Sequence, residues 1–391
     1  MNRKLIMVIS ILALSIGLVA CDREDISRPE NIPSPIVSGV VDGYVAIGRE
    51  EFSVTTTELF LDGMGLCGDF DNLRYMENLQ RLHLSHNEIS DLSPLSELES
   101  LTELLLRNNQ ITDISSLSNL KNLTYLTLYN NQITDLTPLL ELENLKGLEI
   151  SDNRIVDISP LSNLVNLTDL RLSSNQISDI SSLSSLVNLE RLWIGYNQIT
   201  DLSPLSSLTE VTSLVLDNNQ ISDMSPLSDL MNLTSLLIRN NYISNLSPLS
   251  DLTSLETLWA HGNRISDLTP LSSLINLSNL SLGNNQITNL SPLSDIVGLN
   301  ELSLSDNQIN DLTPLSSLAN LTYLYLQNNQ ITNLSPLSDL TNLKWLLLQS
   351  NQIIDLSPFS ELSGVMWLDL RWNPITDWAP VEHIPYVQGR P

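Results

Sequence analysis

The sequence predicts a curved solenoid of about fourteen stacked repeats with a cap at each end, and one spacing carries this prediction. An asparagine recurs every 22 residues without an insertion. A leucine stands five residues before each asparagine, and an isoleucine stands two residues after it. The asparagines of this ladder are Asn87, Asn109, Asn131, Asn153, Asn175, Asn197, Asn219, Asn241, Asn263, Asn285, Asn307, Asn329, Asn351 and Asn373. Such a period indicates small units that bury their apolar residues only by stacking on neighbours.

Each repeat divides into a strand, a bend and a short return segment. Leu-x-Leu before the asparagine predicts a short strand whose alternate residues point inward, so that the strands together form a parallel sheet on the concave face. We expect the asparagine side chain to turn inward and pair with backbone groups at the bend, because buried polar groups need partners. The Ser/Thr-Pro pair that follows, as in Ser93-Pro94, predicts a hydroxyl cap and a single 3₁₀-like turn on the convex face.

The unit is a leucine-rich repeat, and it resembles the repeats of the internalin family of bacterial surface proteins. The resemblance lies in the run Asn-x-Ile-(Ser/Thr)-Asp-Leu-(Ser/Thr)-Pro-Leu after the strand, and it covers residues 79–378. It implies an α/β-type leucine-rich-repeat arc that uses its concave face to grip a protein. Some internalins carry an immunoglobulin-like domain and a wall-anchoring tail, but no such motif follows Trp378, so an invasion role is not carried over.

The first twenty residues are expected to be a lipoprotein signal peptide. Arg3 and Lys4 precede an apolar run that is short for a membrane span. The sequence Leu18-Val19-Ala20-Cys21 resembles the lipobox of bacterial lipoproteins, which implies that Cys21 is lipidated and becomes the new N-terminus. An ordinary secretory signal is the alternative. Residues 21–47 contain three prolines and no apolar periodicity, and they predict a flexible tether.

Both ends of the repeat array are expected to be closed. Residues 48–78 predict an N-terminal cap, in which Met64 takes the place of the ladder asparagine and Cys67 is buried. Phe52, Phe60 and Phe70 are expected to cover the open end of the core. Residues 379–391 predict a C-terminal cap and tail.

Composition and motifs argue against most kinds of chemistry. With 18 basic and 45 acidic residues, the net charge of −27 argues against nucleic-acid binding. There is no nucleophile elbow and no glycine-rich phosphate loop, so we expect neither an enzyme nor a cofactor. His83 and His86 share one strand, but no third residue has the spacing of a metal ligand.

An acidic column follows the ladder. Four residues after each ladder asparagine stands an aspartate in eleven repeats and an asparagine in three. We expect each of these side chains to cap its own turn by accepting backbone N–H bonds. Calcium binding by the stacked carboxylates is the alternative, because calcium prefers several oxygen ligands.

The concave face carries the functional signal. The positions one, two, four and six residues before each ladder asparagine should face outward, and they hold ten of the nineteen aromatic residues and six of the arginines, but only eight acidic residues. A nearly neutral surface rich in aromatics and arginine is typical of a contact site. The candidate ligand-binding residues form a C-terminal cluster of Tyr323, Tyr325, Trp345, Trp367, Arg371 and Trp372, and a central cluster of Arg191, Trp193, Tyr196, Arg239 and Trp259.

The sequence therefore predicts a lipid-anchored, monomeric protein on the extracytoplasmic side of a bacterial envelope, which binds a protein or peptide on its concave face. Only the lipid is expected to contact the membrane. Glycan capture is one alternative, because flat rings in a row suit the faces of sugars. A purely structural role in the envelope is another, in which the stacked aromatics serve only to stabilise the sheet.

Overall fold

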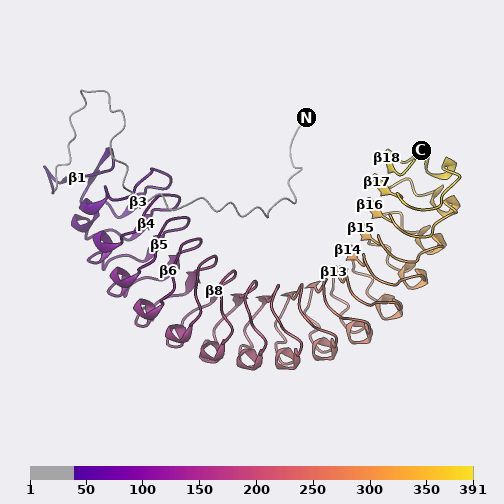
Figure 1. Ribbon diagram of the computed structural model, residues 1–391, viewed down its shortest axis with the longest axis horizontal. Helices are drawn as coiled ribbons and strands as arrows, with labels where there is room; N and C mark the ends of the chain where they lie inside the picture. The colour runs from indigo at the N-terminus through magenta and orange to yellow at the C-terminus, as the bar shows by residue number, and fades with distance from the viewer. Residues whose placement is uncertain (1–38, 391) are drawn as a thin grey trace.

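The computed structural model describes residues 39–390, and this part of the chain forms one continuous arc (Figure 1). Strands line the inner, concave edge, and short helical turns follow one another along the outer, convex edge. The arc confirms the solenoid predicted from the 22-residue period. None of the helices in the described part of the chain has the length and apolar character needed to cross a bilayer.

Sixteen short strands form one parallel sheet in chain order from β3 to β18. The register advances by one repeat from strand to strand, so that Leu82 lies beside Leu104. The strands are β3 (Glu58–Phe60), β4 (Arg81–His83), β5 (Glu103–Leu105), β6 (Tyr125–Thr127), β7 (Gly147–Glu149), β8 (Asp169–Arg171), β9 (Arg191–Trp193), β10 (Ser213–Val215), β11 (Ser235–Leu237), β12 (Thr257–Trp259), β13 (Asn279–Ser281), β14 (Glu301–Ser303), β15 (Tyr323–Tyr325), β16 (Trp345–Leu347), β17 (Trp367–Asp369) and β18 (Tyr386–Gln388).

The core is one apolar cluster that runs the length of the arc, from Val45 to Ile384. In each repeat the middle leucine of the strand and the apolar residue three before the asparagine are buried, as are Leu82 and Leu84. The isoleucine two residues after the asparagine, such as Ile89, is buried in the same layer of the core. Each layer is covered by its neighbours, so burial depends on stacking as the repeat pattern predicts.

The asparagine ladder joins consecutive repeats through hydrogen bonds. Asn109 Oδ1 accepts the backbone N–H of Ile89 in the preceding repeat at 3.0 Å. Its Nδ2 donates to the carbonyls of Leu84 and Leu106 at 3.0 and 3.2 Å. All fourteen ladder asparagines accept an N–H from the preceding repeat or from the cap in this way. The predicted inward turn of the asparagine side chain is confirmed.

Short 3₁₀ helices carry the chain along the convex side. They are η1 (Asp71–Tyr75), η2 (Ser93–Leu95), η3 (Ser115–Leu117), η4 (Thr137–Leu139), η5 (Ser159–Leu161), η6 (Ser181–Ser185), η7 (Ser203–Leu205), η8 (Ser225–Leu227), η9 (Ser247–Leu249), η10 (Thr269–Leu271), η11 (Ser291–Leu293), η12 (Thr313–Leu315), η13 (Ser335–Leu337), η14 (Ser357–Phe359) and η15 (Ala379–Val381). The predicted 3₁₀ return on the convex face is confirmed.

The caps of these turns differ from the prediction. Ser93 is the first residue of η2, and the Oδ1 of Asp91 accepts its N–H at 2.8 Å. The same bond recurs in all fourteen repeats, with an asparagine as acceptor in three of them. The prediction that the Ser/Thr hydroxyl caps the turn is therefore wrong. The side chain two residues earlier accepts the free N–H at the start of the turn instead. The capping interpretation of the acidic column is confirmed.

The N-terminal cap begins with a hairpin of β1 (Tyr44–Ile47) and β2 (Glu50–Ser53), which pair antiparallel. Val45 and Ile47 are buried in the core. Residues 44–47, which the sequence assigns to the tether, therefore belong to the cap. The sequence does not reveal the hairpin, because its two buried apolar residues, Val45 and Ile47, are too few to show a pattern.

The aromatic residues of the cap do not all cover the core. Phe70 is buried, and Phe52 packs partly against the core as expected. Phe60 is exposed on the concave side and lies edge-on to His83, with 4.6 Å between ring centroids. Met64 is also exposed, so it does not take the inward place of a ladder asparagine.

The signal peptide, Cys21 and most of the predicted tether lie outside the described residues. Cys67 is partly exposed rather than buried, and its sulfur is in a disulfide. The prediction that Cys67 is buried is therefore wrong.

Candidate binding surface

Four aromatic residues stand in one column at the C-terminal end of the concave face. Tyr323, Trp345, Trp367 and Tyr386 lie beside one another on β15 to β18. The rings of Trp345 and Trp367 are stacked at 5.4 Å and 11°, and those of Trp367 and Tyr386 at 6.0 Å and 28°. Tyr386 was not among the candidates, because it follows Trp367 by 19 residues and so falls outside the 22-residue period.

This stacking decides which parts of the rings remain free. Trp345 and Tyr386 lie on strands on opposite sides of Trp367 and cover its two faces. Both faces of the Trp367 ring are therefore covered, and each of Trp345 and Tyr386 has one face covered. A sugar ring needs a free aromatic face, so the arrangement favours contact with a protein, or stabilisation of the sheet, over sugar stacking.

Every arginine at the outward positions of the concave face has a carboxylate partner on that face. Arg81 pairs with Glu58 and Glu103, Arg107 with Glu149, Arg171 and Arg191 with Asp169, Arg239 with Asp217, and Arg371 with Asp369. The sequence showed the near balance of charge but not these pairs, because the partners stand at different offsets in the same or a nearby repeat. The arginines are therefore fixed donors rather than mobile surface charges.

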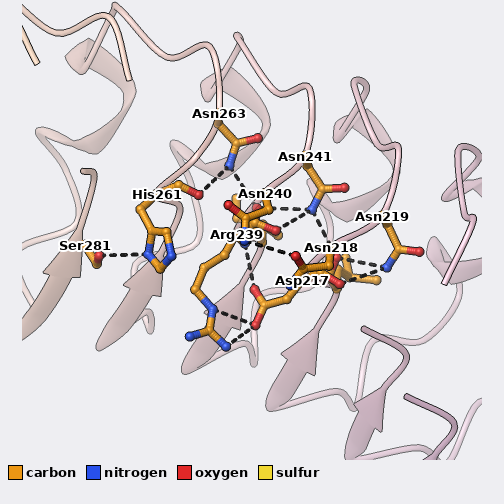
Figure 2. Close-up of polar contacts among 11 residues, drawn as sticks. Asp217, Asn218, Asn219, Arg239, Asn240, Asn241, His261, Asn263 and Ser281 are labelled. Atoms are coloured by element: carbon orange, nitrogen blue, oxygen red, sulfur yellow. Dashed lines mark hydrogen bonds and ion pairs between the residues drawn. The ribbon is translucent and has the colours of Figure 1, made fainter. Parts of the chain in front are cut away.

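The pair Asp217–Arg239 shows how the guanidinium is held (Figure 2). Asp217 is only 1% exposed, and its Oδ1 accepts the backbone N–H of Arg239 at 2.7 Å. Its Oδ2 accepts the Nε of the same arginine at 2.7 Å. The guanidinium carbon of Arg239 lies 5.0 Å from the centre of the Trp259 ring, so the side chain is fixed on both sides.

His261 continues this network on the next repeat. Its Nδ1 lies 3.3 Å from the Oγ of Ser281. Burial lowers the pKa of His261, the charge of Arg239 lowers it further, and Asp217 acts in the opposite direction. The imidazole is therefore neutral near pH 7 and works as a hydrogen-bonding group.

The same arrangement of carboxylate, guanidinium and indole occurs three times, and we call it the Asp–Arg–Trp unit. Its members are Asp169, Arg171 and Trp193; Asp217, Arg239 and Trp259; and Asp369, Arg371 and Trp372. The guanidinium carbon lies 4.2, 5.0 and 5.1 Å from the ring centre. A rigid arginine beside a large ring suits recognition, because little conformational freedom is lost on binding.

The residue before each ladder asparagine adopts a left-handed backbone, with φ between 52° and 71° in all fourteen repeats. Asn, Asp, Ser or Gly occupies this position in eleven of them, and His86, Tyr196 and Trp372 are the others. Tyr196 and Trp372 are 57% and 72% exposed. A bulky side chain is strained in this conformation, so two exposed aromatics there mark a functional position. The sequence placed them on the concave face but gave no sign of the strain.

The central cluster does not form a single group. Arg191, Trp193 and Tyr196 belong to one repeat, in which Arg191 pairs with Asp169 and Trp193 lies under Arg171, whereas Arg239 and Trp259 form a separate unit. In the C-terminal cluster, Tyr325 is partly buried, and burial, Glu301 and Tyr323 together raise its pKa. Its hydroxyl therefore stays protonated at neutral pH.

His83 ends β4 and His86 lies in the bend after it, and the two do not form a metal centre with their neighbours. His83 Nε2 lies 2.9 Å from the Oε1 of Glu103, so a hydrogen bond engages this ring. Within residues 39–390, no group of three or more His, Cys, Asp or Glu side chains is placed to hold a metal ion.

A concave parallel sheet, a convex row of 3₁₀ turns and an asparagine ladder together define a leucine-rich-repeat protein. The family model for two copies of the leucine-rich repeat matches residues 99–141, 143–185, 187–229, 232–273, 253–295 and 297–339, and the single-copy model matches residues 78–98. The chain belongs to the leucine-rich-repeat family and is internalin-like among its bacterial members.

Three solved structures illustrate the likeness. An internalin from Listeria monocytogenes is 36% identical, with a TM-score of 0.72 over 78% of this chain and 91% of that one. A leucine-rich-repeat protein of Leptospira interrogans is 25% identical, with a TM-score of 0.74 over 86% and 96%. A plant receptor kinase ectodomain from Arabidopsis thaliana, in complex with Casparian strip integrity factor 2, shares the fold at 24% identity, with a TM-score of 0.66 over 84% and 46%. Among curated proteins, no sequence matches.

Proposed function

We propose that this chain is a lipid-anchored, extracytoplasmic binding protein that recognises a protein partner through its concave face. The leucine-rich-repeat fold is typical of proteins that bind other proteins. The observation that carries the proposal is the pair Tyr196 and Trp372, which stand exposed and backbone-strained in the same repeats as Arg191 and Arg371. Exposed aromatics beside fixed arginines are the residues that dominate protein interfaces.

A glycan partner is the weaker candidate. Its support in the sequence is the row of large rings at the C-terminal end, but both faces of the central ring, Trp367, are covered by Trp345 and Tyr386. A structural role accounts for that stack equally well. It does not account for Tyr196, which is exposed and lies far along the arc from the stacked column.

A binding screen tests the proposal. The chain from Asp22 onward, immobilised through its C-terminus, is presented with secreted proteins and with glycans. A second sample carries Tyr196→Asn and Trp372→Asn, and circular dichroism verifies that it is folded. A protein retained by the parent and lost by the variant supports the proposal. If the parent retains a glycan and the variant does not, the partner is a glycan and not a protein. If neither sample binds any ligand saturably, the structural role is favoured.

The anchor is a separate part of the proposal. Its support is the lipobox-like run that ends in Cys21. A sulfur that carries lipid cannot also form a disulfide, and Cys67 is disulfide-bonded in the structure. Mass spectrometry of the N-terminal peptide decides between the two chemistries. Acyl chains on Cys21, lost in Cys21→Ser together with membrane association, support the anchor, whereas an unmodified peptide linked to Cys67 contradicts it.

A further inference from the structure

One Asp–Arg–Trp unit differs from the other two in its balance of charge. Asp169 accepts the Nε and Nη2 of Arg171 at 3.0 Å each, and it also accepts the Nε of Arg191 at 2.9 Å. One carboxylate therefore serves two guanidinium groups. Burial alone would raise the pKa of Asp169, but the hydrogen bonds from both arginines outweigh it, so the pKa lies below its ordinary value.

The other carboxylates nearby do not restore the balance on the concave side. Glu149 lies beside Arg171 in the sheet register, and its Oε2 forms an ion pair with Arg107 Nη2 at 2.7 Å, although this buried oxygen accepts no hydrogen bond within the described residues. Glu190 is exposed, and its Oε2 lies 4.0 Å from Arg191 Nη1, which is too far for a hydrogen bond. Within residues 39–390, Nη1 of Arg171 and both Nη atoms of Arg191 donate no hydrogen bond.

A third side chain at this place, Trp193, also has a donor without an acceptor. Trp193 lies under the guanidinium of Arg171, and its Nε1 is buried with no hydrogen-bond partner in the described part of the chain. Buried polar groups without partners are rare in folded proteins and call for an explanation. The free donors around Arg171, Arg191 and Trp193 therefore outnumber the one buried carboxylate oxygen there that accepts no hydrogen bond, Glu149 Oε2.

We infer that Arg171 and Arg191 bind a carboxylate group of the partner protein. This inference rests on the proposed function and names the chemistry that one part of the surface recognises. A carboxylate supplies two acceptor oxygens, and guanidinium groups bind it through paired hydrogen bonds. Tyr196, five residues after Arg191 in the same repeat, adds an exposed ring to the same part of the concave face.

The acidic character of the whole molecule does not oppose this contact. The net charge is −27, but at physiological salt the charge of distant groups is screened beyond about 8 Å. The local donors therefore decide the binding. An acidic side chain is favoured over an acidic sugar, because Tyr196 and the guanidinium–indole stack form a surface typical of protein interfaces.

The experiment uses the full chain in detergent, with every tryptophan replaced by 5-fluorotryptophan, which gives six fluorine resonances. Trp193→Phe assigns one resonance, and Trp259→Phe assigns another. The probe is aspartate capped at both ends, and capped asparagine is its neutral control. We expect a saturable shift of the Trp193 resonance with capped aspartate alone, while Trp259, whose unit is balanced, does not shift.

Two matched variants distinguish binding at this site from a general effect of removing a positive charge. Arg191→Gln should weaken the interaction about fivefold or more, because a charge-assisted pair is lost. Arg81→Gln should leave it unchanged, since Arg81 occupies the same strand position but already faces Glu58 and Glu103. Arg191→Lys, which keeps the charge but not the paired geometry, should fall between them.

The inference is overturned if capped aspartate and capped asparagine shift Trp193 equally, if neither shifts it, or if Arg191→Gln binds as the parent does. Tighter binding of galacturonate than of capped aspartate would show that the site prefers an acidic glycan, and this result would also overturn the inference. These failures leave the proposed function standing, because a protein captured on the concave face through Trp372 or Trp367 would still support it.

Discussion

Tyr196 and Trp372 occupy the same position in two repeats that are eight repeats apart, and both hold a left-handed backbone, with φ of 55° and 58°. Each precedes its ladder asparagine, where most other repeats place Asn, Asp, Ser or Gly. With strands about 4.8 Å apart, the two rings are separated by roughly 38 Å along the sheet. A partner that touches both must be a protein of some size, or an extended segment of a dozen residues or so.

The first prediction concerns this strain. Tyr196→Asn should raise the free energy of unfolding by about 1 kcal/mol, because asparagine adopts the left-handed conformation more readily than tyrosine does. Chemical denaturation measures the change. Asn218→Tyr, which introduces the ring one repeat later, should lower stability by a similar amount. A loss of stability in Tyr196→Asn would show that the ring serves the fold rather than a partner.

The second prediction concerns the buried aspartate below Arg239. Asp217→Ala should lower the free energy of unfolding by about 3 kcal/mol or more, because the guanidinium and a backbone N–H both lose their acceptor. Asp251→Ala, at an exposed position, should change it by less than about 0.5 kcal/mol. Equal effects of the two substitutions in thermal melts would refute the role given to the pair.

The third prediction concerns the asparagine ladder. Asn241 accepts the N–H of Ile221 at 3.0 Å and donates to the carbonyl of Ile238 at 3.2 Å. Asn241→Ala should cost about 3 kcal/mol or more, since it leaves buried backbone groups without partners. Gln220→Ala serves as the control, because Gln220 is exposed and directly precedes Ile221 in the chain. Urea denaturation of both variants decides the matter, and a cost below about 1 kcal/mol would contradict the account.

The fourth prediction is a dependence on acid. Hydrogen bonds from the side chain and then the backbone of Ser225 lower the pKa of Asp223, and Asp135, Asp267 and Asp311 are lowered in the same way. A carboxyl whose pKa is lower in the folded state adds stability above its unfolded pKa of about 3.9, and that stability is lost as pH falls through the folded value.

Asp223→Asn isolates this effect, because asparagine caps the equivalent turn at Asn245. The stability difference between parent and variant should be constant near neutral pH and should change only below about pH 4. The overall repulsion of the acidic protein is nearly the same in both and largely cancels. A difference that is independent of pH down to pH 2 would contradict the prediction.

The fold could be predicted from the sequence because one spacing determines it. The ladder asparagines, the strands and the aspartate caps follow from a period that never slips between Asn87 and Asn373. The ends could not be predicted in the same detail. The hairpin at Tyr44–Ile47 lies outside the period, and so does Tyr386, which completes the aromatic column.

The binding surface could be predicted in composition but not in geometry. Outward positions in a repeat can be counted from the sequence, and this found Trp193, Trp345 and Trp372. The pairing of Arg239 with Asp217 depends on which side chains reach across one repeat, and the spacing does not give that. The sequence does not predict the stacking of Trp345 on Trp367 either. This stacking favours a protein partner over a glycan, because it covers a face of each ring.

The central claim is that the concave face recognises a protein through its strained aromatics. The measurement that tests it most directly is calorimetric titration of a captured partner into the parent and into a variant that carries both Tyr196→Asn and Trp372→Asn. The account predicts a loss of affinity of at least about 100-fold, with a free energy of unfolding equal to or above that of the parent. Unchanged affinity, with the fold intact, would contradict it.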